Sequence, residues 1–275
     1  MNKNIDDKVV NEFGNEWTEF DQSELSNDEL NSIFHEYFQI FPWKKLNKNS
    51  KGFDLGCGSG RWAKCVAPKV GHLHCLDPSN SIIVAKKNLE NFDNCTFYQK
   101  GVDELPFDDN SMDFGYSLGV LHHIPDTLDG MKKCVDKLKK DSPFLVYLYY
   151  AFDNQPFWYR LIWKFSDFFR RIISKFPFKL KLVLTNIIAF LIYLPLATLS
   201  KILKNIGFNI HSFPLSNYHD KSFYTMKTDA LDRFGTRLEL RYTKKEIIDM
   251  MEKSGLKDII FSTSNPFWCA VGIKK

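Results

Sequence analysis

The spacing of hydrophobic and polar residues predicts a regular alternation of strands and helices along most of the chain. Five apolar runs have the length of strands: residues 52–55, 72–77, 95–100, 112–119 and 144–150. Three segments between them have helical spacing: 61–67, 81–91 and 127–139. Strands that alternate with helices in this way form parallel sheets with right-handed crossovers. A further helix is predicted before them, at 24–41, and Pro42 ends it.

The alternation stops after the fifth strand and resumes near Thr243. Thr243 and Glu246 have the spacing of a capping box, which predicts the start of a helix that ends before Gly255. Two more strands, at 258–263 and 267–273, follow this helix. The predicted fold is a doubly wound α/β core with a mostly parallel, seven-stranded sheet, in which a helical insertion precedes the last helix and the last two strands.

This pattern divides the chain of 275 residues into four segments. They are an N-terminal helical lid (1–46), an α/β core (47–150), a helical insertion that caps the substrate (151–242) and a C-terminal segment that completes the core (243–275). The length is sufficient for one full-sized α/β domain with an elaboration, or for two small domains.

The first part of the insertion predicts an amphipathic helix. Its apolar face is expected to contain Trp158, Leu161, Ile162, Phe165, Phe169, Ile172, Ile173 and Phe176, and its basic face Arg160, Lys164, Arg171 and Lys175. Residues 156–206 include nine Lys/Arg and one acid, Asp167, which gives this segment a charge of +8 within a chain total of +4. The surplus favours an anionic substrate or an anionic lipid surface, and a solvated helix face is the alternative.

An uncharged run of 19 residues, 182–200, follows in the insertion. Its length would permit a membrane span. A single crossing would, however, separate the last two strands from the strand at 144–150, which they are expected to join in one sheet. Pro195 is also expected to interrupt the run. We therefore predict a buried cap helix, with a helix that lies in the membrane interface as the alternative.

The six cysteines and the N-terminus indicate the compartment. The cysteines show no C-x-x-C pairing, which disfavours both a zinc site and a disulfide framework. No apolar signal region opens the sequence. We expect a cytoplasmic protein without a metal site.

The strongest chemical signal is the segment Asp54-Leu55-Gly56-Cys57-Gly58-Ser59-Gly60-Arg61, where the first strand turns into the first helix. Glycines permit a sharp turn and let a ligand approach the backbone closely, and this edge of a parallel sheet is where ligands bind. The spacing is G-x-G-x-G rather than the G-x-G-x-x-G of dinucleotide loops, and an acid precedes it. An acid is a poor neighbour for a pyrophosphate but suits a cationic ligand such as S-adenosylmethionine (SAM), which has a sulfonium and an α-ammonium group.

Two further acids follow the next two strands. Asp77 ends the second strand, before Pro78, at the spacing where an acid can hold both ribose hydroxyls. Asp103 follows the third strand, where a carboxylate can accept a hydrogen bond from an adenine amino group.

These motifs resemble those of class I SAM-dependent methyltransferases, over residues 52–150 and again in the C-terminal strands. The similar segments are DLGCGSGRW, LDPS, the acid-x-LPF segment and SLGVLHHIPD, and they are typical of the branch that includes ubiquinone, menaquinone, sugar and lipid methyltransferases. The resemblance implies that Asp54 and the loop glycines surround the methionine moiety, that Asp77 holds the ribose, that Val102 and Asp103 contact adenine, and that Leu118 lines the floor. The implied cofactor-binding set is Asp54, Gly56, Cys57, Gly58, Gly60, Arg61, Asp77, Pro78, Val102, Asp103 and Leu118. An N-terminal helix normally covers SAM in this group, and Phe13 and Trp17 are the candidates for this contact, with core packing as the alternative.

Candidate acceptor residues follow the fourth strand and end the insertion. His122 and His123 are expected to face the cofactor or the acceptor, where a histidine can act as a base, and a histidine that starts a helix is the alternative. His219 is a further catalytic candidate. Tyr218, Arg233 and Arg241 are candidate substrate contacts, because arginines can grip a phosphate or carboxylate, and a salt-bridged turn is the alternative.

The sequence therefore predicts a methyltransferase that acts on a small, anionic or amphipathic acceptor, such as a nucleotide-linked sugar, a lipid or a prenylated ring. The alternative is a non-catalytic SAM-binding protein whose insertion docks on a partner or a membrane, and a nicotinamide-dependent oxidoreductase ranks third. Nucleic acid is not expected as the acceptor, because the overall charge is mild and no N/D-P-P-Y/F motif is present. Peripheral membrane contact through the basic insertion is an open alternative, and no pattern specifies an oligomeric state.

Overall fold

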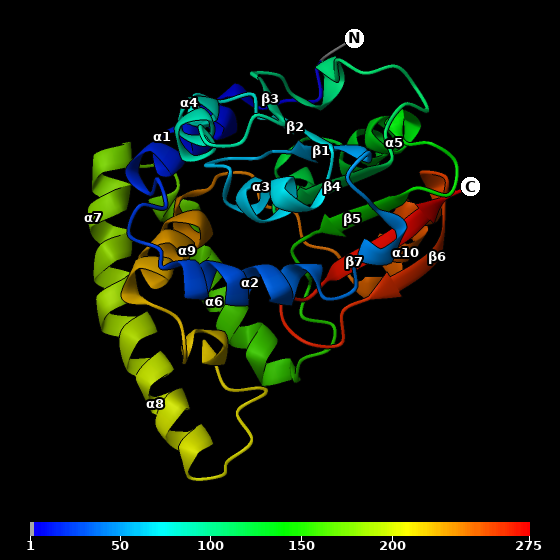
Figure 1. The fold of residues 1–275 in the computed structure, drawn as a ribbon. Coiled ribbons are helices and arrows are strands. Elements are labelled where there is room, and N and C mark those ends of the chain that lie inside the picture. Colours follow the sequence, from blue (N-terminus) through cyan, green and yellow to red (C-terminus); the bar gives the residue numbers. More distant parts are fainter. Residues whose placement is uncertain (1–2) are drawn as a thin grey trace. The chain divides into compact units, whose positions relative to one another are not determined.

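The computed structural model describes residues 3–275 and divides the chain into two compact units (Figure 1). The first unit comprises Met1–Gln22, Leu30–Ala151 and Leu238–Lys275. The second comprises Ser23–Glu29 and Phe152–Arg237. The second unit therefore consists mostly of the segment that interrupts the α/β alternation.

A seven-stranded sheet forms the centre of the first unit, in the order β3-β2-β1-β4-β5-β7-β6. The strands are β1 (Lys51–Leu55), β2 (His72–Leu76), β3 (Cys95–Tyr98), β4 (Phe114–Leu118), β5 (Pro143–Tyr147), β6 (Leu256–Phe261) and β7 (Cys269–Lys274). The first five are parallel, and β7 is antiparallel to both β5 and β6. The order reverses at β1, so the ends of β1 and β4 flank the position where open α/β sheets bind ligands. The predicted fold class is confirmed.

Helices and short turns connect these strands. They are α1 (Asp7–Glu19), α2 (Asn27–Phe38), η1 (Trp43–Lys45), α3 (Arg61–Val66), η2 (Ala67–Lys69), α4 (Ser81–Asn88), η3 (Val102–Glu104), η4 (Leu121–His123), α5 (Thr127–Lys137) and α10 (Lys244–Lys253). The capping box of Thr243 and Glu246 is present at the start of α10. Asp6 caps α1, because its side chain accepts hydrogen bonds from the amides of Lys8 and Val9.

Two apolar clusters form the core of the first unit. Successive residues of a strand point to opposite faces of the sheet, so Phe144 belongs to one cluster and Leu145 to the other. Phe53 and Phe144 are both fully buried in the second cluster, and Tyr116 is fully buried in the first. This buried sheet holds the strand ends in fixed positions.

The second unit is helical. Its elements are α6 (Phe157–Ile173), α7 (Phe178–Ile188), the π-helical turn η5 (Ala189–Tyr193), α8 (Leu194–Asn205), the short turn η6 (Ser216–Tyr218) and α9 (Phe223–Gly235). Helix α9 lies against both α6 and α7. The core of the second unit includes Ile173, Ala189, Tyr193, Met226 and Phe234.

The long apolar segment differs from the prediction in two respects. Pro195 does not interrupt it: α7, η5 and α8 form one helix, Phe178–Asn205, and the π-helical turn just before Pro195 accommodates the missing N–H. The helix is also not buried, because only 22% of its most apolar window lies inside the protein. The predicted buried cap helix is therefore wrong. By length and composition the helix is able to cross a membrane. The pairing of β5 with β7 does join the last strands to the sheet, as expected.

Candidate functional site

The glycine loop leaves β1 in a conformation that only glycine adopts easily. Gly56, Gly58 and Gly60 have φ of +76°, +53° and +80°. A Cβ on Gly56 would lie 2.2 Å from a side-chain carbon of Val120, so a larger residue would not fit. Gly60 is the N-cap of α3. The loop thus presents bare backbone at the carboxyl end of β1.

Asp54 places a buried carboxyl group directly before this loop. Its exposed fraction is 1%. Burial raises the pKa of Asp54 to about 8, and the nearby carboxylate of Asp77 adds to the shift. Tyr116 opposes the shift, although its hydroxyl does not meet the geometry of a hydrogen bond to Asp54. Neither carboxyl oxygen of Asp54 has a hydrogen-bond partner within the described chain.

Asp77 follows β2 and links the end of this strand to the glycine loop that follows β1. One of its oxygens accepts a hydrogen bond from the Gly58 amide at 3.0 Å. The other accepts from the amide and the hydroxyl of Ser79, at 2.9 and 2.6 Å. Asp77 therefore fixes the shape of the glycine loop, in addition to the ribose contact that the sequence predicts for it.

Helix α1 covers this loop. A Cβ on Gly58 would lie 2.9 Å from the indole nitrogen of Trp17. The Arg61 guanidinium lies over the rings of Trp17 and Trp62, with its central carbon 5.2 and 4.3 Å from their centroids. Phe13, one turn earlier in α1, contacts the His123 ring at a centroid distance of 4.9 Å. Both aromatic residues of the predicted lid thus lie at the ends of the parallel strands.

The remaining predicted cofactor residues lie near the same edge of the sheet. Cys57, Val102 and Leu118 are buried in the core clusters, and Pro78 is half-buried. Asp103 has protein partners for both oxygens, because it accepts from the Asn4 amide at 2.6 Å and the Lys133 ammonium at 2.7 Å. Burial acts to raise its pKa, but these two hydrogen bonds outweigh burial and lower it. The adenine contact of Asp103 stays a prediction.

His122 and His123 form a buried pair after β4, in η4. Their ring centroids are 4.0 Å apart. His122 is fully buried, and neither of its ring nitrogens has a hydrogen-bond partner within the described chain. Burial, with the nearby His123 and Arg241, lowers the pKa of His122 well below its ordinary value, so this ring is neutral at pH 7.

Hydrogen bonding sets the tautomer of His123. Its Nδ1 lies 2.6 Å from the Leu238 carbonyl oxygen. A carbonyl can only accept a hydrogen bond, so Nδ1 carries the proton and Nε2 has the lone pair. This arrangement gives Nε2 of His123 the chemistry of a base.

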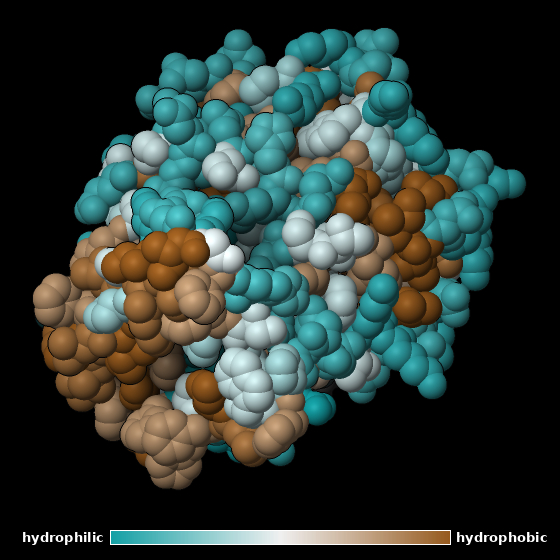
Figure 2. All heavy atoms as spheres, turned by 90° about the horizontal axis from the view of Figure 1, so that it is seen from below, coloured by the Kyte–Doolittle hydropathy of each residue, from teal (hydrophilic) through white to brown (hydrophobic). Residues whose placement is uncertain are grey.

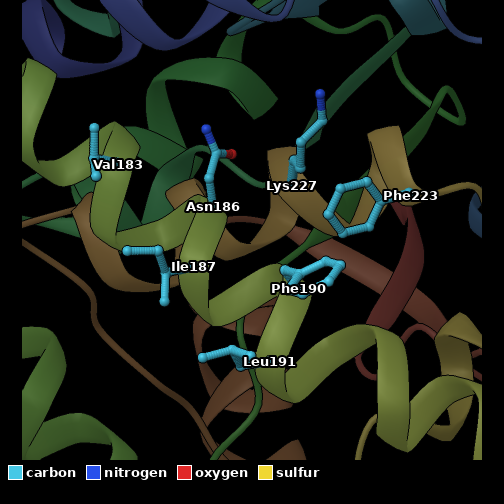
Figure 3. A pocket seen from close by; sticks show the side chains of 7 residues that line it. All are labelled: Val183, Asn186, Ile187, Phe190, Leu191, Phe223 and Lys227. Atoms are coloured by element: carbon cyan, nitrogen blue, oxygen red, sulfur yellow. The ribbon is translucent and has the colours of Figure 1, made fainter.

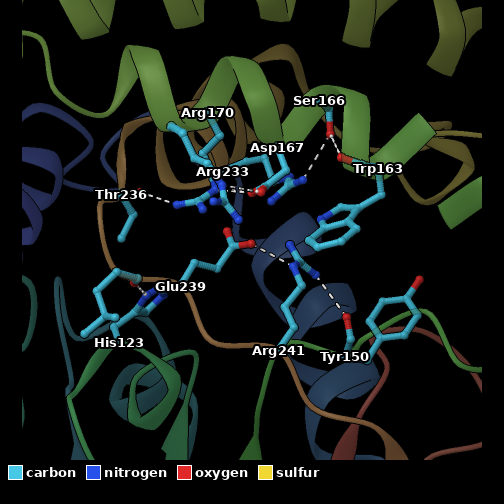
Figure 4. A network of polar contacts seen from close by, with 12 residues as sticks. His123, Tyr150, Trp163, Ser166, Asp167, Arg170, Arg233, Thr236, Glu239 and Arg241 are labelled. Atoms are coloured by element: carbon cyan, nitrogen blue, oxygen red, sulfur yellow. Dashed lines mark hydrogen bonds and ion pairs between the residues drawn. The ribbon is translucent and has the colours of Figure 1, made fainter. Parts of the chain in front are cut away.

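Arg241 and Tyr149 complete this cluster, and Figure 4 shows Arg241 with its partners Glu239 and Tyr150. The Tyr149 ring lies 4.0 Å from the His122 ring at an interplanar angle of 31°. The Arg241 guanidinium lies 5.0 Å from the centroid of Tyr149 and donates to Glu239 at 2.7 Å and to the Tyr150 carbonyl at 3.1 Å. The structure thus brings Arg241 beside both histidines. Tyr149 was not predicted as a site residue, because the sequence placed it inside the fifth strand, at 144–150, whereas β5 ends at Tyr147.

The other three predicted site residues lie in the second unit. His219 contacts Lys204 and Asp220 through Nε2, and the Ser216 carbonyl through Nδ1. The Tyr218 ring contacts Tyr193 at 5.1 Å. Arg233 donates to the Ser166 hydroxyl at 3.1 Å and lies 6.0 Å from the Trp163 ring (Figure 4). These contacts give all three residues structural partners, and their catalytic or substrate roles stay predictions.

Metal-binding geometry is absent from residues 3–275, where no three His, Cys, Asp or Glu side chains are grouped to hold an ion. The six cysteines are free, and four of them are buried.

Comparison with known proteins supports the resemblance to methyltransferases. Residues 53–146 match the family model of the methyltransferase domain. Demethylmenaquinone methyltransferase of Staphylococcus carnosus (strain TM300) is 31% identical over 133 residues, which cover 44% of this chain and 54% of the relative. The chain thus spans about half the length of the curated relatives it matches.

Solved structures share the fold at low sequence identity. A chain in the complex of the Haloferax volcanii Trm112 methyltransferase activator with a methyltransferase has a TM-score of 0.51 at 13% identity, and covers 93% of this chain and 97% of that chain. A SAM-dependent methyltransferase from Thermotoga maritima has a TM-score of 0.50 at 14% identity, and covers 97% and 99%. At these identities the likeness shows the fold alone.

Sheet order, glycine loop and family model agree. Residues 53–146 match the methyltransferase domain, and the resemblance to class I SAM-dependent methyltransferases seen in the motifs is confirmed. The relatives that it matches are named for a menaquinone precursor, which agrees with the predicted branch. SAM is the cofactor that this family implies.

Proposed function

We propose that the protein transfers a methyl group from SAM to a small amphipathic acceptor. The observation that carries this proposal is the carboxyl group of Asp54, which is buried without a hydrogen-bond partner in residues 3–275, directly before the bare glycine loop that Trp17 contacts. A buried carboxyl group without a partner is costly, so a cationic ligand is the natural partner for it. The hydroxyl of Ser59 in the same loop is also buried without a hydrogen-bond partner within the described chain. These residues fit the ammonium-bearing end of SAM.

When bound, SAM supplies a methyl group on a positively charged sulfur that is already activated for transfer. The protein then has to hold the cofactor, orient the acceptor and exclude water. We assign the first task to Asp54, Asp77 and the loop amides. Trp17 and Phe13 on α1 exclude water from the strand ends.

We further propose that the cluster after β4 and β5 receives the acceptor. His122 is buried and neutral, and neither of its ring nitrogens has a hydrogen-bond partner among residues 3–275, so a polar group of the acceptor is the natural partner for it. The flat faces of Tyr149 and His122 suit a ring. Nε2 of His123 is able to take a proton from an acceptor hydroxyl.

Among the acceptor classes that the sequence leaves open, a prenylated ring is the first choice. The aromatic lining of the cluster supports it, and the relatives are named for demethylmenaquinone. A lipid and a nucleotide-linked sugar are the other classes. We also propose that the enzyme works in the cytoplasm at a membrane surface, where such acceptors are found.

A transfer assay tests this proposal. The full chain would be incubated with SAM labelled in the methyl group and with a demethylated prenylated quinol, a phospholipid or a nucleotide-linked sugar, and label in each product would be counted. We expect label in the quinol, and a large loss of rate in His123→Asn but not in His35→Asn, a matched change at an exposed histidine. SAM binding without label in any acceptor would favour the non-catalytic alternative.

A further inference from the structure

The outer surface of the second unit is strongly apolar. Of the 21 large hydrophobic side chains exposed in the described chain, 19 belong to this unit. Phe165, Phe190 and Leu191 are 69%, 58% and 63% exposed. Figure 2 shows a dense group of apolar side chains at the lower left of the view. A soluble surface rarely has this many, so the area indicates an interaction site.

Helix α6 buries two of its charged side chains. Asp167 and Arg170 are each 6% exposed, and the Arg170 guanidinium donates to Asp167 at 2.6 Å and to the Thr236 carbonyl at 3.0 Å (Figure 4). The predicted apolar face of this helix, in contrast, faces outward: Leu161 and Phe165 are 56% and 69% exposed. An ordinary amphipathic helix of a soluble protein has the opposite arrangement.

Helix α7 also buries a charged side chain and exposes apolar ones. Lys181 is 3% exposed and donates to the Gly235 carbonyl at 2.8 Å, at the carboxyl end of α9. Thr185, one turn later, is fully buried. Val183 and Ile187 on the other side are 55% and 48% exposed. Two helices that each bury a charged group and expose several apolar side chains indicate an apolar medium outside.

The positive charge at this surface indicates which kind of apolar medium it contacts. Of the nine Lys/Arg residues between positions 156 and 206, only Arg170 and Lys181 are buried, so seven are exposed. The single acid of that segment, Asp167, is buried and bonded to Arg170 and Arg171. A surface of exposed apolar and cationic side chains matches an anionic lipid bilayer.

We propose that α6, α7 and α8 form a membrane-docking surface that lies in the interface of an anionic bilayer. A full crossing by the helix Phe178–Asn205 is disfavoured, because α9 lies along α7 and contains Lys227, Asp229, Asp232 and Arg233. Taking these charges into hydrocarbon would be costly. Docking in the plane buries the apolar side chains and leaves the lysines at the headgroups.

A shallow groove of about 590 Å³ lies on this surface (Figure 3). Its apolar lining consists of Val183, Ile187, Phe190, Leu191 and Phe223, and Asn186 and Lys227 supply its polar groups. The Lys227 ammonium lies 5.9 Å from the Phe223 ring. The apolar walls of the groove fit a lipid acyl chain, and the Lys227 cation fits a lipid phosphate. The groove therefore supports lipid as the partner of this surface.

This inference goes beyond methyl transfer and holds whether or not the protein transfers a methyl group. The experiment is flotation of the full chain with vesicles of phosphatidylcholine alone or mixed with phosphatidylglycerol. We expect the protein to bind the mixed vesicles, and we expect added salt to weaken this binding. Binding to vesicles of phosphatidylcholine alone should be at least tenfold weaker than binding to the mixed vesicles. Each of Lys164→Glu and Lys175→Glu should weaken binding by roughly fivefold or more.

A triple variant, Phe165→Ser with Phe190→Ser and Leu191→Ser, should reduce binding to background. Ile83→Ser is the matched control, because Ile83 is 65% exposed but lies in α4 of the first unit. SAM titration of every variant separates the two proposals, since these changes should leave SAM affinity unchanged.

Three results would overturn the proposal. They are equal binding of the triple variant and the parent chain, no binding of the parent chain to any vesicle, and light scattering that shows a stable dimer which the triple variant loses. Retention on vesicles after alkaline carbonate extraction would contradict interfacial docking and indicate a span.

Discussion

The buried carboxyl group of Asp54 makes a quantitative prediction about SAM binding. Its pKa is raised to about 8 by burial, so it is mostly protonated below pH 7 in the free protein. A cationic ligand binds best to the ionised form. Binding should therefore release a proton and strengthen as the pH rises.

The size of the effect follows from the ionised fraction. With a pKa of about 8, roughly 1% of Asp54 is ionised at pH 6.0 and about one quarter at pH 7.5. The apparent affinity is reduced by the fraction of the competent state, so the dissociation constant should fall roughly twentyfold between these pH values.

Isothermal titration at pH 6.0 and 7.5 measures this change. Asp54→Asn is the control, because the amide cannot ionise and any titration of SAM itself is common to both proteins. We expect weaker binding by the variant and little dependence of its affinity on pH. Equal pH dependence in the two proteins would refute the role of Asp54.

Four other predictions concern single residues. Gly56→Ala should abolish SAM binding, measured by titration, because the added methyl group clashes with a neighbouring side chain and φ is +76°. Trp17→Ala should speed SAM release by roughly tenfold in stopped-flow fluorescence, and Trp17→Phe should not, because an aromatic ring contributes most of the cover over the loop. The His122 ring should show no titration between pH 6 and 8 by NMR, since its pKa lies well below 6.5, and a shift in that range would contradict its burial as a neutral ring. Arg170→Ala should lower the free energy of unfolding by about 3 kcal/mol in denaturant titration, because it leaves Asp167 buried without its main partner, and a change below about 1 kcal/mol would contradict this.

The sequence was most informative where the pattern is local. The α/β alternation, the capping box of Thr243 and the glycine loop all depend on short spacings, and the structure contains each of them. The lid residues Phe13 and Trp17 also lie at the strand ends.

Features that depend on distant contacts were not predictable. Asp167 and Arg170 of α6 face inward, where Arg170 bonds to the Thr236 carbonyl oxygen 66 residues later, whereas the amphipathic pattern alone places charged side chains outward. The pairing of Arg241 with the Tyr150 carbonyl, across 91 residues, likewise has no local signal. Pro195 failed to end the helix because a π-helical turn compensates for it.

The assignment of SAM as the cofactor is tested by titrating the purified chain with SAM and, separately, with NADH, with Asp77→Asn as the variant. We expect saturable SAM binding at about micromolar concentration, weakened in the variant because Asp77 shapes the loop through the Gly58 amide, and no binding of NADH. NADH binding, or no SAM binding by a chain whose circular dichroism shows that it is folded, would contradict it.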